Sequence, residues 1–377
     1  MSRRLLFPGS LDWTALAAAL GLSALGLLTM NSFVGEDPFF SRQLVWVAMG
    51  LGVFFAAGVV DWRFLRGSGV AVSVYAVPLA LLAILFLFGE EIRGARGWFD
   101  IGIFSLQPAE FAKLALIIVL AKYFSRRHIE IRNVRHILIS GAYAALMFLL
   151  VAAQPDFGSA IIVGLIWLSM VLVSGISRVH LAGVLLAGTV VFGGLWFFGF
   201  EEYQKQRIVT FLYPSDILGA GYSAYQSTVA VGSGELFGKG IGYGTQSKLR
   251  FLPEYQSDFI FAAFAEEWGF VGVLIVFGLF GVLFMRILQS AALGATNFET
   301  LFAFGVLGYL GAHFVLHVGI NMGLLPVTGT TIPFMSYGGS HLLAEFLALG
   351  MLSGMRRYAR AVHREELTQE FSGGYDL

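Results

Sequence analysis

Ten apolar segments, each long enough to cross a lipid bilayer as a helix, dominate this sequence. A transmembrane helix needs about 20 mostly apolar residues. The segments cover residues 11–31, 41–60, 69–88, 108–124, 137–153, 158–174, 180–199, 259–285, 299–323 and 336–355. Apolar residues make up 57% of the 377-residue chain and charged residues 13%, a composition far from that of water-soluble domains. The sequence therefore predicts an all-α, polytopic membrane protein with about ten transmembrane helices, in one domain that covers residues 1–362.

Charge and cysteine content exclude several other classes of protein. The formal net charge is zero and the chain has no cysteines. A neutral chain has no bulk attraction for nucleic acid, so we expect no nucleic-acid partner. Without cysteines, disulfides, thiolate metal sites and cysteine nucleophiles are impossible. The first apolar segment is long enough to span and lacks a small-residue cleavage site, so we interpret it as a retained helix rather than a signal peptide.

Lysine and arginine residues predict the orientation, because loops that carry them next to a span stay in the cytoplasm. With the N-terminus in the cytoplasm, the inner loops and tails hold fifteen such residues, and the short outer loops hold Arg42, Arg93 and Arg96. Both termini are therefore predicted to be cytoplasmic. Residues 200–258, between the seventh and eighth spans, then form one long extracytoplasmic loop. Residues 363–377 form a polar cytoplasmic tail, which we expect to be disordered.

Charged residues inside apolar segments are costly in a membrane, so each one suggests a function. Glu110 and Lys113 stand three apart in the fourth segment, on one helical face, where they can pair. Two interpretations remain open. The pair neutralises itself and holds the helix against its neighbours, or it lines a water-filled cavity in which Lys113 holds a phosphate as a point charge. We interpret Glu345, in the last segment, as a residue for packing or for an interhelical hydrogen bond rather than for catalysis.

Another carboxylate, Asp258, lies where the long polar loop meets the eighth apolar segment. Ser257 and Asp258 occupy positions typical of a helix N-cap, and composition alone favours that role. Glu266 and Glu267 follow about two turns later, and two adjacent carboxylates in an apolar helix are not explained by capping. We expect one of them to face a cavity or a basic partner.

The glycines between Gly232 and Gly244 suggest a phosphate-binding loop but fail its tests. Ser233 and Gly240 break the Walker pattern, and no GxGxxG spacing occurs. The loop lies close in sequence to three cations, Lys239, Lys248 and Arg250. It therefore suits an extended anionic ligand, and the alternatives are a solvated basic loop or a surface that attracts anionic lipid heads.

Two further patterns occur in the last third of the chain. His313 and His317 stand four apart, a spacing compatible with metal ligation, but no carboxylate in the outer half of the same segment completes a site. We therefore favour interior histidines with satisfied hydrogen bonds. Residues 324–340 place two prolines between the ninth and tenth spans. A non-helical backbone at that depth must be buried in protein or line water.

Four blocks of the sequence resemble the SEDS proteins of bacterial cell-wall synthesis (shape, elongation, division and sporulation), in the same order. They are FSLQPAEFAKLAL (Phe104 to Leu116), QPDFGSA (Gln154 to Ala160), the stretch from Gly219 to Phe270, and NMGLLPVTGTTIPFMSYGGS (Asn321 to Ser340). Within the family, GTQS, LPVTG and FFSRQLVW resemble the rod-shape members more than the division members. The sequence departs from the residues usual in the family at Ala109, Gln256, Ser257 and His341. At the position of His341, a small residue is frequent in the family. None of them removes a charged group.

The resemblance implies a peptidoglycan glycosyltransferase that polymerises lipid II on the outer face of the bacterial cytoplasmic membrane, for cell elongation and shape. It carries the family's catalytic aspartate onto Asp258, its helix-four acid and base onto Glu110 and Lys113, and its QPD acid onto Asp156. It also implies a partner, a class B penicillin-binding protein that crosslinks the glycan strands.

The implied reaction joins the 4-hydroxyl of one lipid-linked disaccharide to the anomeric carbon of another, inverts that centre and expels a polyprenyl pyrophosphate. We expect Asp258 to be the general base. Candidate substrate-binding residues are Lys113, Glu110, Arg96, Trp98, Lys248, Arg250 and Asp156. The sequence specifies no cofactor, although a divalent cation, Mg²⁺ or Mn²⁺, is compatible with a pyrophosphate leaving group. Two rival functions remain open, a lipid II flippase and a non-enzymatic scaffold of the wall-synthesis complex.

Overall fold

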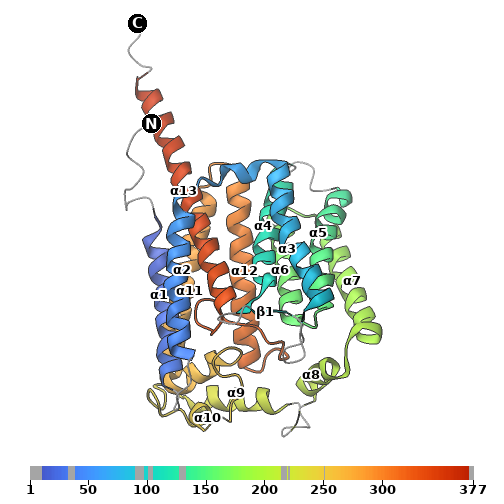
Figure 1. Ribbon diagram of the computed structural model, residues 1–377, viewed down its shortest axis with the longest axis vertical. Helices are drawn as coiled ribbons and strands as arrows, with labels where there is room; N and C mark the ends of the chain where they lie inside the picture. The colour runs from blue at the N-terminus through green and yellow to red at the C-terminus, as the bar shows by residue number, and fades with distance from the viewer. Residues whose placement is uncertain are drawn as a thin grey trace.

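The computed structural model describes residues 11–32, 39–89, 97–100, 105–126, 133–213, 219, 221–249 and 251–372. Within these residues, ten long helices lie side by side in a bundle (Figure 1). They are α1 (Trp13–Asn31), α2 (Phe39–Val59), α3 (Ser68–Phe88), α4 (Pro108–Ser125), α5 (Val134–Ala152), α6 (Phe157–Val173), α7 (Arg178–Gly194), α11 (Ile260–Ala292), α12 (Asn297–Asn321) and α13 (Gly339–Ser372). They follow the ten predicted spans in order. The prediction of an all-α, polytopic membrane protein is confirmed.

The ten helices differ in length and in how apolar they are. Seven of the described helices are long and apolar enough to cross a membrane, and α6 is apolar but only 17 residues long. Helix α4 carries Glu110, Lys113 and Lys122 among its 18 residues, yet most of its side chains are buried. Because its neighbours cover it, its charges need not face lipid.

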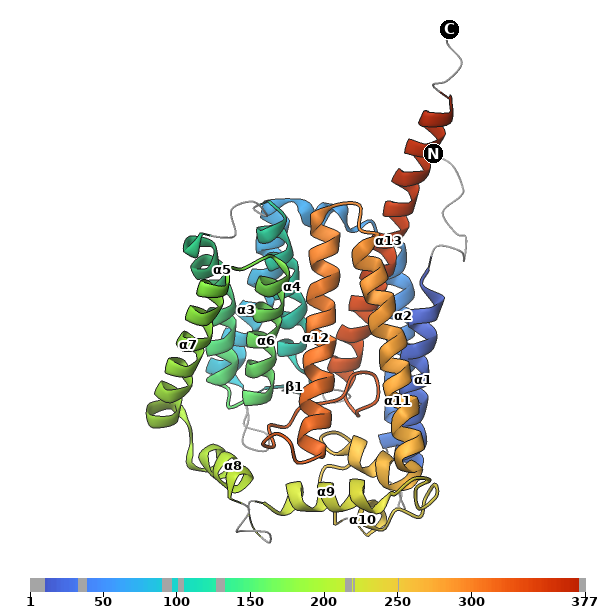
Figure 2. The same ribbon diagram turned by 180° about the vertical axis from the view of Figure 1, so that it is seen from behind.

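Shorter elements join the helices at the two ends of the bundle. They are the 3₁₀-helix η2 (Trp62–Arg66), strands β1 (Phe99–Asp100) and β2 (Ser105–Leu106), the π-helical turn η3 (Leu195–Gly199), and helices α8 (Glu202–Leu212), α9 (Tyr222–Ser233) and α10 (Thr245–Lys248). The two strands pair antiparallel. Figure 2 shows α8, α9 and α10 lying across the end of the bundle opposite the one from which α13 protrudes. We call the end that carries α8 to α10 the loop end.

Local sequence sets where several helices begin. The side chains of Asp12, Asn133, Asp156 and Ser177 each accept a backbone hydrogen bond from the first turn of α1, α5, α6 and α7. Such N-caps satisfy amide groups that have no partner within the helix. Since a lipid environment offers no hydrogen bonds, helix ends satisfied in this way suit a membrane bundle.

The eighth predicted span is not one straight helix. Gly269 lies inside α11 with φ +65°, outside the helical region, and divides the short helical stretch Ile260–Trp268 from the long apolar stretch that follows. A Cβ atom at Gly269 would lie 2.2 Å from the backbone nitrogen of Gly238. The kink is therefore where the glycine-rich loop packs against α11. The sequence alone did not predict it, because a glycine in an apolar run is compatible with a continuous helix.

The polar tail also differs from the expectation of disorder. Helix α13 continues to Ser372, so residues 363–372 are helical, and 373–377 lie outside the described residues. This stretch is rich in Glu, Leu, Gln and Arg, which are good helix formers. It extends a helix that already exists, so no nucleation is needed.

The connection between α12 and α13 is non-helical. Its second half is buried in protein, whereas Met322, Leu324 and Gly329 in its first half are exposed. Thr330, Ile332, Phe334, Met335 and Ser336 are each at most 4% exposed. The side chain of Gln43 on α2 donates to the carbonyl oxygen of Ser336 at 3.0 Å and accepts from the backbone of Gly338 at 3.3 Å. The connection is thus satisfied by protein groups. We call residues 322–338 the re-entrant loop.

Candidate functional site

Asp258 lies at the loop end of the bundle, in the turn that precedes α11, and its side chain is half-buried. The N-cap position of α11 belongs to Phe259, and no side chain caps this helix. The capping role that composition favoured for Asp258 is therefore wrong, because the helix begins one position too late. The carboxylate is left free for another task.

The backbone around Asp258 is held by groups from distant parts of the chain. Asn321 Nδ2 donates to the carbonyl oxygen of Asp258 at 3.0 Å. Ser336 Oγ donates to the carbonyl oxygen of Ser257 at 2.8 Å, and the Tyr337 N–H donates to that of Gln256 at 2.8 Å. The end of α12 and the re-entrant loop together fix where the aspartate stands.

The charge environment makes Asp258 easier to protonate than an exposed aspartate. Burial raises the pKa of its carboxyl group to about 6, and the negative charges of Glu254 and Asp156 act in the same direction. A hydrogen bond from Ser257 and the positive charge of Arg207 lower the pKa. Arg207 lies on α8 and is exposed. Arg207 was not predicted as a site residue, because nothing in its local sequence pattern separates it from other loop cations.

Asp156 comes from the start of α6, where it acts as N-cap. Its Oδ1 accepts from the backbone of Ser159 at 3.0 Å, and its Oδ2 accepts from Gln107 Nε2 at 3.1 Å. The start of α6 also touches the re-entrant loop, since a Cβ at Gly158 would lie 2.7 Å from the carbonyl oxygen of Thr328. The charge of Asp156 also raises the pKa of Asp258, so the structure places the two carboxylates near each other.

The other substrate-binding candidates are placed less completely. Trp98 is half-buried and directly precedes β1. Lys248 is exposed on α10, with Nζ 5.7 Å from the centroid of the Tyr243 ring. Arg96 and Arg250 lie outside the described residues.

Glu110 and Lys113 form a pair inside the bundle. Lys113 Nζ lies 2.7 Å from Glu110 Oε1, and the two residues are 0% and 4% exposed. Lys113 Nζ also lies 3.3 Å from His313 Nε2, and the hydroxyl of Tyr309 donates to Glu110 Oε2 at 3.1 Å. The geometry favours a self-neutralising pair over a cavity lining. In this conformation Lys113 acts on a ligand only through its neighbours.

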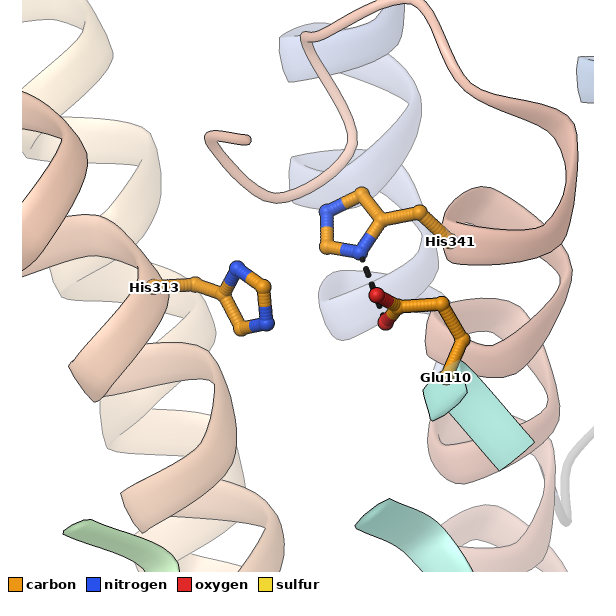
Figure 3. A group of neighbouring side chains, drawn as sticks. All are labelled: Glu110, His313 and His341. Atoms are coloured by element: carbon orange, nitrogen blue, oxygen red, sulfur yellow. Dashed lines mark hydrogen bonds and ion pairs between the residues drawn. The ribbon is translucent and has the colours of Figure 1, made fainter. Parts of the chain in front are cut away.

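A second histidine completes the surroundings of Glu110. His341 Nδ1, from α13, lies 3.1 Å from Glu110 Oε2 (Figure 3). On its other side, His341 Nε2 lies 2.8 Å from Glu345 Oε1. Glu345 Oε2 accepts a hydrogen bond from the backbone of Phe334 at 2.8 Å. Within the described residues, Glu345 contacts the re-entrant loop and its own helix rather than a second helix, so the contacts favour the packing role over the interhelical hydrogen bond. We call Glu110, Lys113, His313, His341 and Glu345 the buried charge cluster.

The arrangement of Glu110, His313 and His341 resembles a metal site, because one potential ligand atom from each lies within 4.8 Å of the others. Lys113, however, already supplies the positive charge at this point. Two imidazoles also suit Mg²⁺ or Mn²⁺ poorly, since these ions prefer oxygen. His313 Nδ1 and His317 Nδ1 lie 3.1 and 2.7 Å from the carbonyl oxygens of Thr331 and Thr330. The histidines of α12 are therefore interior and contact the re-entrant loop, as predicted. Their hydrogen bonds are not all satisfied, because His317 Nε2 has no partner among the described residues.

Glu266 and Glu267 bind the glycine-rich loop. Glu266 Oε1 lies 2.8 Å from Lys239 Nζ and accepts from Thr245 Oγ1 at 3.0 Å. Glu267 Oε1 accepts from Ser32 Oγ at 2.6 Å and from the backbone of Gly242 at 3.0 Å. The prediction of a basic partner is confirmed. Since Glu266 already neutralises Lys239, this cation is not free for an anionic ligand.

The glycines allow that loop to approach α11 closely. Gly238 and Gly240 have φ +77° and +96°, a region that favours glycine. A Cβ at Gly238 would lie 2.1 Å from the carbonyl oxygen of Glu267. Close packing against the α11 backbone therefore explains Gly234 and Gly238 without a phosphate-binding loop.

Comparison with known proteins agrees with this architecture. A family described as cell cycle protein, whose model carries the names FtsW, RodA and SpoVE, matches residues 5–361. The chain is similar to peptidoglycan glycosyltransferase MrdB of Escherichia coli strain K12, at 38% identity over 94% of this chain and 95% of the relative.

Two solved structures are also similar. One is a chain from a structure described as "Structural coordination of polymerization and crosslinking by a peptidoglycan synthase complex", with a TM-score of 0.79 and 32% identity over 93% of this chain and 98% of that one. The other is the rod shape determining protein RodA of Thermus thermophilus, with a TM-score of 0.70 and 30% identity over 92% of this chain and 97% of that one. These similarities extend over nearly the full length, and the chain belongs to the FtsW/RodA/SpoVE family, the SEDS proteins.

Proposed function

We propose that this protein is a peptidoglycan glycosyltransferase that polymerises lipid II on the outer face of the bacterial cytoplasmic membrane, in cell elongation. The observation that carries the proposal is Asp258, a half-buried carboxylate that does not cap its helix and whose backbone is fixed by α12 and the re-entrant loop. The name of the similar MrdB protein, peptidoglycan glycosyltransferase, supports the same activity.

Asp258 acts as the general base. It accepts the proton of the acceptor's 4-hydroxyl while that oxygen forms a bond to the anomeric carbon of the donor. The bond from the anomeric carbon to the pyrophosphate oxygen breaks, the pyrophosphate leaves with the bonding electrons, and the anomeric centre inverts. A base works best when its pKa lies near the working pH. A pKa of about 6 keeps Asp258 ionised at neutral pH while leaving it more basic than an exposed aspartate.

The leaving group needs positive charge, and cations at the loop end supply it. Arg207 lies close enough to lower the pKa of Asp258, and Lys248 is exposed on α10. Fixed cations stabilise charge that develops on a leaving pyrophosphate. Arg96 and Arg250 are further candidates for this role. Trp98, half-buried next to β1, offers a ring on which a sugar can stack.

Glu110 and Lys113 act on the reaction from within the bundle. They belong to the buried charge cluster, which contacts the re-entrant loop through His313 and Glu345. That loop lies next to Asp258, because a Cβ at Gly329 would be 3.5 Å from Asp258 Oδ2. We assign to the pair the task of keeping this loop, and hence the site, in place.

The distribution of charge supports an extracytoplasmic site. Arg63 and Arg66 lie in η2 between α2 and α3, Arg178 begins α7, and Arg286 lies near the end of α11. The start of α7 and the end of α11 lie at the end of the bundle opposite α8 to α10 (Figure 2). Positive residues next to spans stay in the cytoplasm. The loop end then faces the outside, where lipid II is polymerised.

The partner that we propose is a class B penicillin-binding protein. The similar chain comes from a peptidoglycan synthase complex that coordinates polymerisation and crosslinking, which supports a crosslinking partner for this protein.

One experiment separates the proposed activity from its rivals. Purified protein in liposomes receives labelled lipid II, with and without a class B penicillin-binding protein, in Mg²⁺, in Mn²⁺ or in chelator. A polymerase yields glycan ladders, a flippase yields translocated lipid, and a scaffold yields neither. Ladders support the proposal, and either of the other outcomes contradicts it.

A further inference from the structure

His341 stands between two buried carboxylates. Its Nδ1 lies 3.1 Å from Glu110 Oε2, and its Nε2 lies 2.8 Å from Glu345 Oε1. The three residues are 4%, 4% and 0% exposed. They lie away from bulk solvent, so an unbalanced charge among them is costly.

The contacts indicate how protons are arranged in the buried charge cluster. An ionised carboxylate only accepts hydrogen bonds, so His341 Nδ1 carries the proton in its bond to Glu110. The Glu345 oxygen lies at ion-pair distance from Nε2 without hydrogen-bond geometry. Two bare lone pairs 2.8 Å apart would repel each other, so Nε2 carries a proton as well. The lysine ammonium only donates, so His313 Nε2 accepts from Lys113 and His313 is neutral, with its Nδ1–H donating to Thr331. Tyr309 donates its hydroxyl proton to Glu110.

The charges then cancel. Glu110 and Glu345 contribute two negative charges, and Lys113 contributes one positive charge. A doubly protonated His341 supplies the second. The net charge of the cluster stays at zero, because Tyr309, His313 and His317 are neutral.

The cluster is also what holds the re-entrant loop from the side of the bundle core. Glu345 accepts from the Phe334 backbone, and His313 and His317 contact the carbonyl oxygens of Thr331 and Thr330. The same loop carries Gly329, next to Asp258. A change in the cluster's charge therefore reaches the catalytic carboxylate through the loop backbone.

We propose that His341 is a positioning residue whose imidazolium balances Glu110 and Glu345 and thereby holds the re-entrant loop in the geometry that places Asp258 for catalysis. Its effect on turnover rests on the proposed function, whereas its charge state does not.

The first test is a charge-compensation pair of variants. His341→Gln keeps hydrogen-bonding ability but leaves two buried carboxylates facing Lys113 alone, so we expect lipid II polymerisation to fall about tenfold or more. Adding Glu345→Gln removes the surplus negative charge, and the new amide oxygen can still accept from Phe334. We expect the double variant to recover to within about threefold of wild type.

His317→Gln is the matched control. His317 is buried on the same helix as His313 and contacts the re-entrant loop, and the structure describes no carboxylate among its hydrogen-bond partners. Glu345→Gln should give no recovery in this background. Failure of Glu345→Gln to rescue His341→Gln, or equal rescue of His317→Gln, would overturn the inference.

Infrared difference spectroscopy tests the charge state without any activity. We compare the wild type with Glu345→Gln and with Glu110→Gln in the region of the carboxylic acid carbonyl stretch. If His341 is an imidazolium, neither substitution removes such a band. A band that either substitution removes places the proton on a carboxyl group and overturns the assignment. A wild-type protein that makes no glycan contradicts the proposed function instead, and leaves this measurement to judge His341.

Discussion

Asn321, the last residue of α12, joins that helix to the segment that carries Asp258. Its Nδ2 donates to the carbonyl oxygen of Asp258 at 3.0 Å, and its Oδ1 accepts from the backbone of Ala262 at 3.0 Å. The side chain is fully buried. One amide therefore fixes the backbone of Asp258 and the first turn of α11 relative to α12.

Replacing Asn321 with Ala removes both bonds. The Ala262 N–H and the Asp258 carbonyl group lose their partner in a buried place, which costs about 1–3 kcal/mol. We expect a lower melting temperature in detergent and a lower kcat for lipid II polymerisation. Ser227→Ala is the control, because it removes a hydrogen bond to the Asn321 carbonyl group and leaves the Asn321 side chain in place. Equal kcat in the two variants would contradict the role given to Asn321.

Gly329→Ala tests the contact between the re-entrant loop and the aspartate. Gly329 has φ +72°, where a side chain costs about 1–2 kcal/mol, and the added methyl group would lie 3.5 Å from Asp258 Oδ2. We expect the rate of lipid II polymerisation to fall even at temperatures where the variant is fully folded. Gly311→Ala, in α12 with open space around it, should leave the rate unchanged. A Gly329→Ala enzyme as fast as Gly311→Ala would argue against a site beside this glycine.

The rate of polymerisation should rise with pH through about 6 and then level off. The base works only when ionised, and burial raises the pKa of Asp258 to about 6, so protonation removes activity below that pH. Arg207 lowers this pKa and Glu254 raises it. Arg207→Gln should therefore move the midpoint of the pH–rate profile up, and Glu254→Gln should move it down. Shifts in the opposite directions would refute the assignment.

Lys113→Met should destabilise the protein strongly. It leaves Glu110 buried with one cation fewer, and breaking a buried ion pair from one side costs about 3–5 kcal/mol. Lys113→Met with Glu110→Gln removes one charge of each sign and should regain much of that stability. The exposed pair of Lys205 and Glu202, 3.1 Å apart, provides the control, since Lys205→Met should cost no more than about 1 kcal/mol. Thermal unfolding in detergent measures all three.

The helices were predictable from sequence and their distortions were not. A run of about 20 apolar residues has few alternatives to a transmembrane helix, because every backbone group must be satisfied without water. Gly269, by contrast, looks like any glycine in an apolar run, and only the packing of Gly238 against it explains its φ of +65°. The helical extension of α13 to Ser372 was missed because a polar tail can be helical or disordered.

Several residues of the candidate site were predictable from sequence, but their contacts and exact positions relative to the helix ends were not. Asp258 stood out as an acidic residue at a boundary between loop and span, but its role as cap or base depended on where α11 begins, to within one residue. The contact between Glu110 and His341 joins residues 231 positions apart. No local pattern reports such a contact, and His341 drew attention only as a departure from the family.

The central claim is tested most directly by the rate at which the Asp258→Asn protein polymerises lipid II. Asparagine has nearly the same shape but cannot take a proton, and the loss of a general base reduces the rate by about 10²–10⁴-fold. The account predicts that loss with an unchanged melting temperature. Glycan ladders formed by Asp258→Asn at the wild-type rate would contradict it.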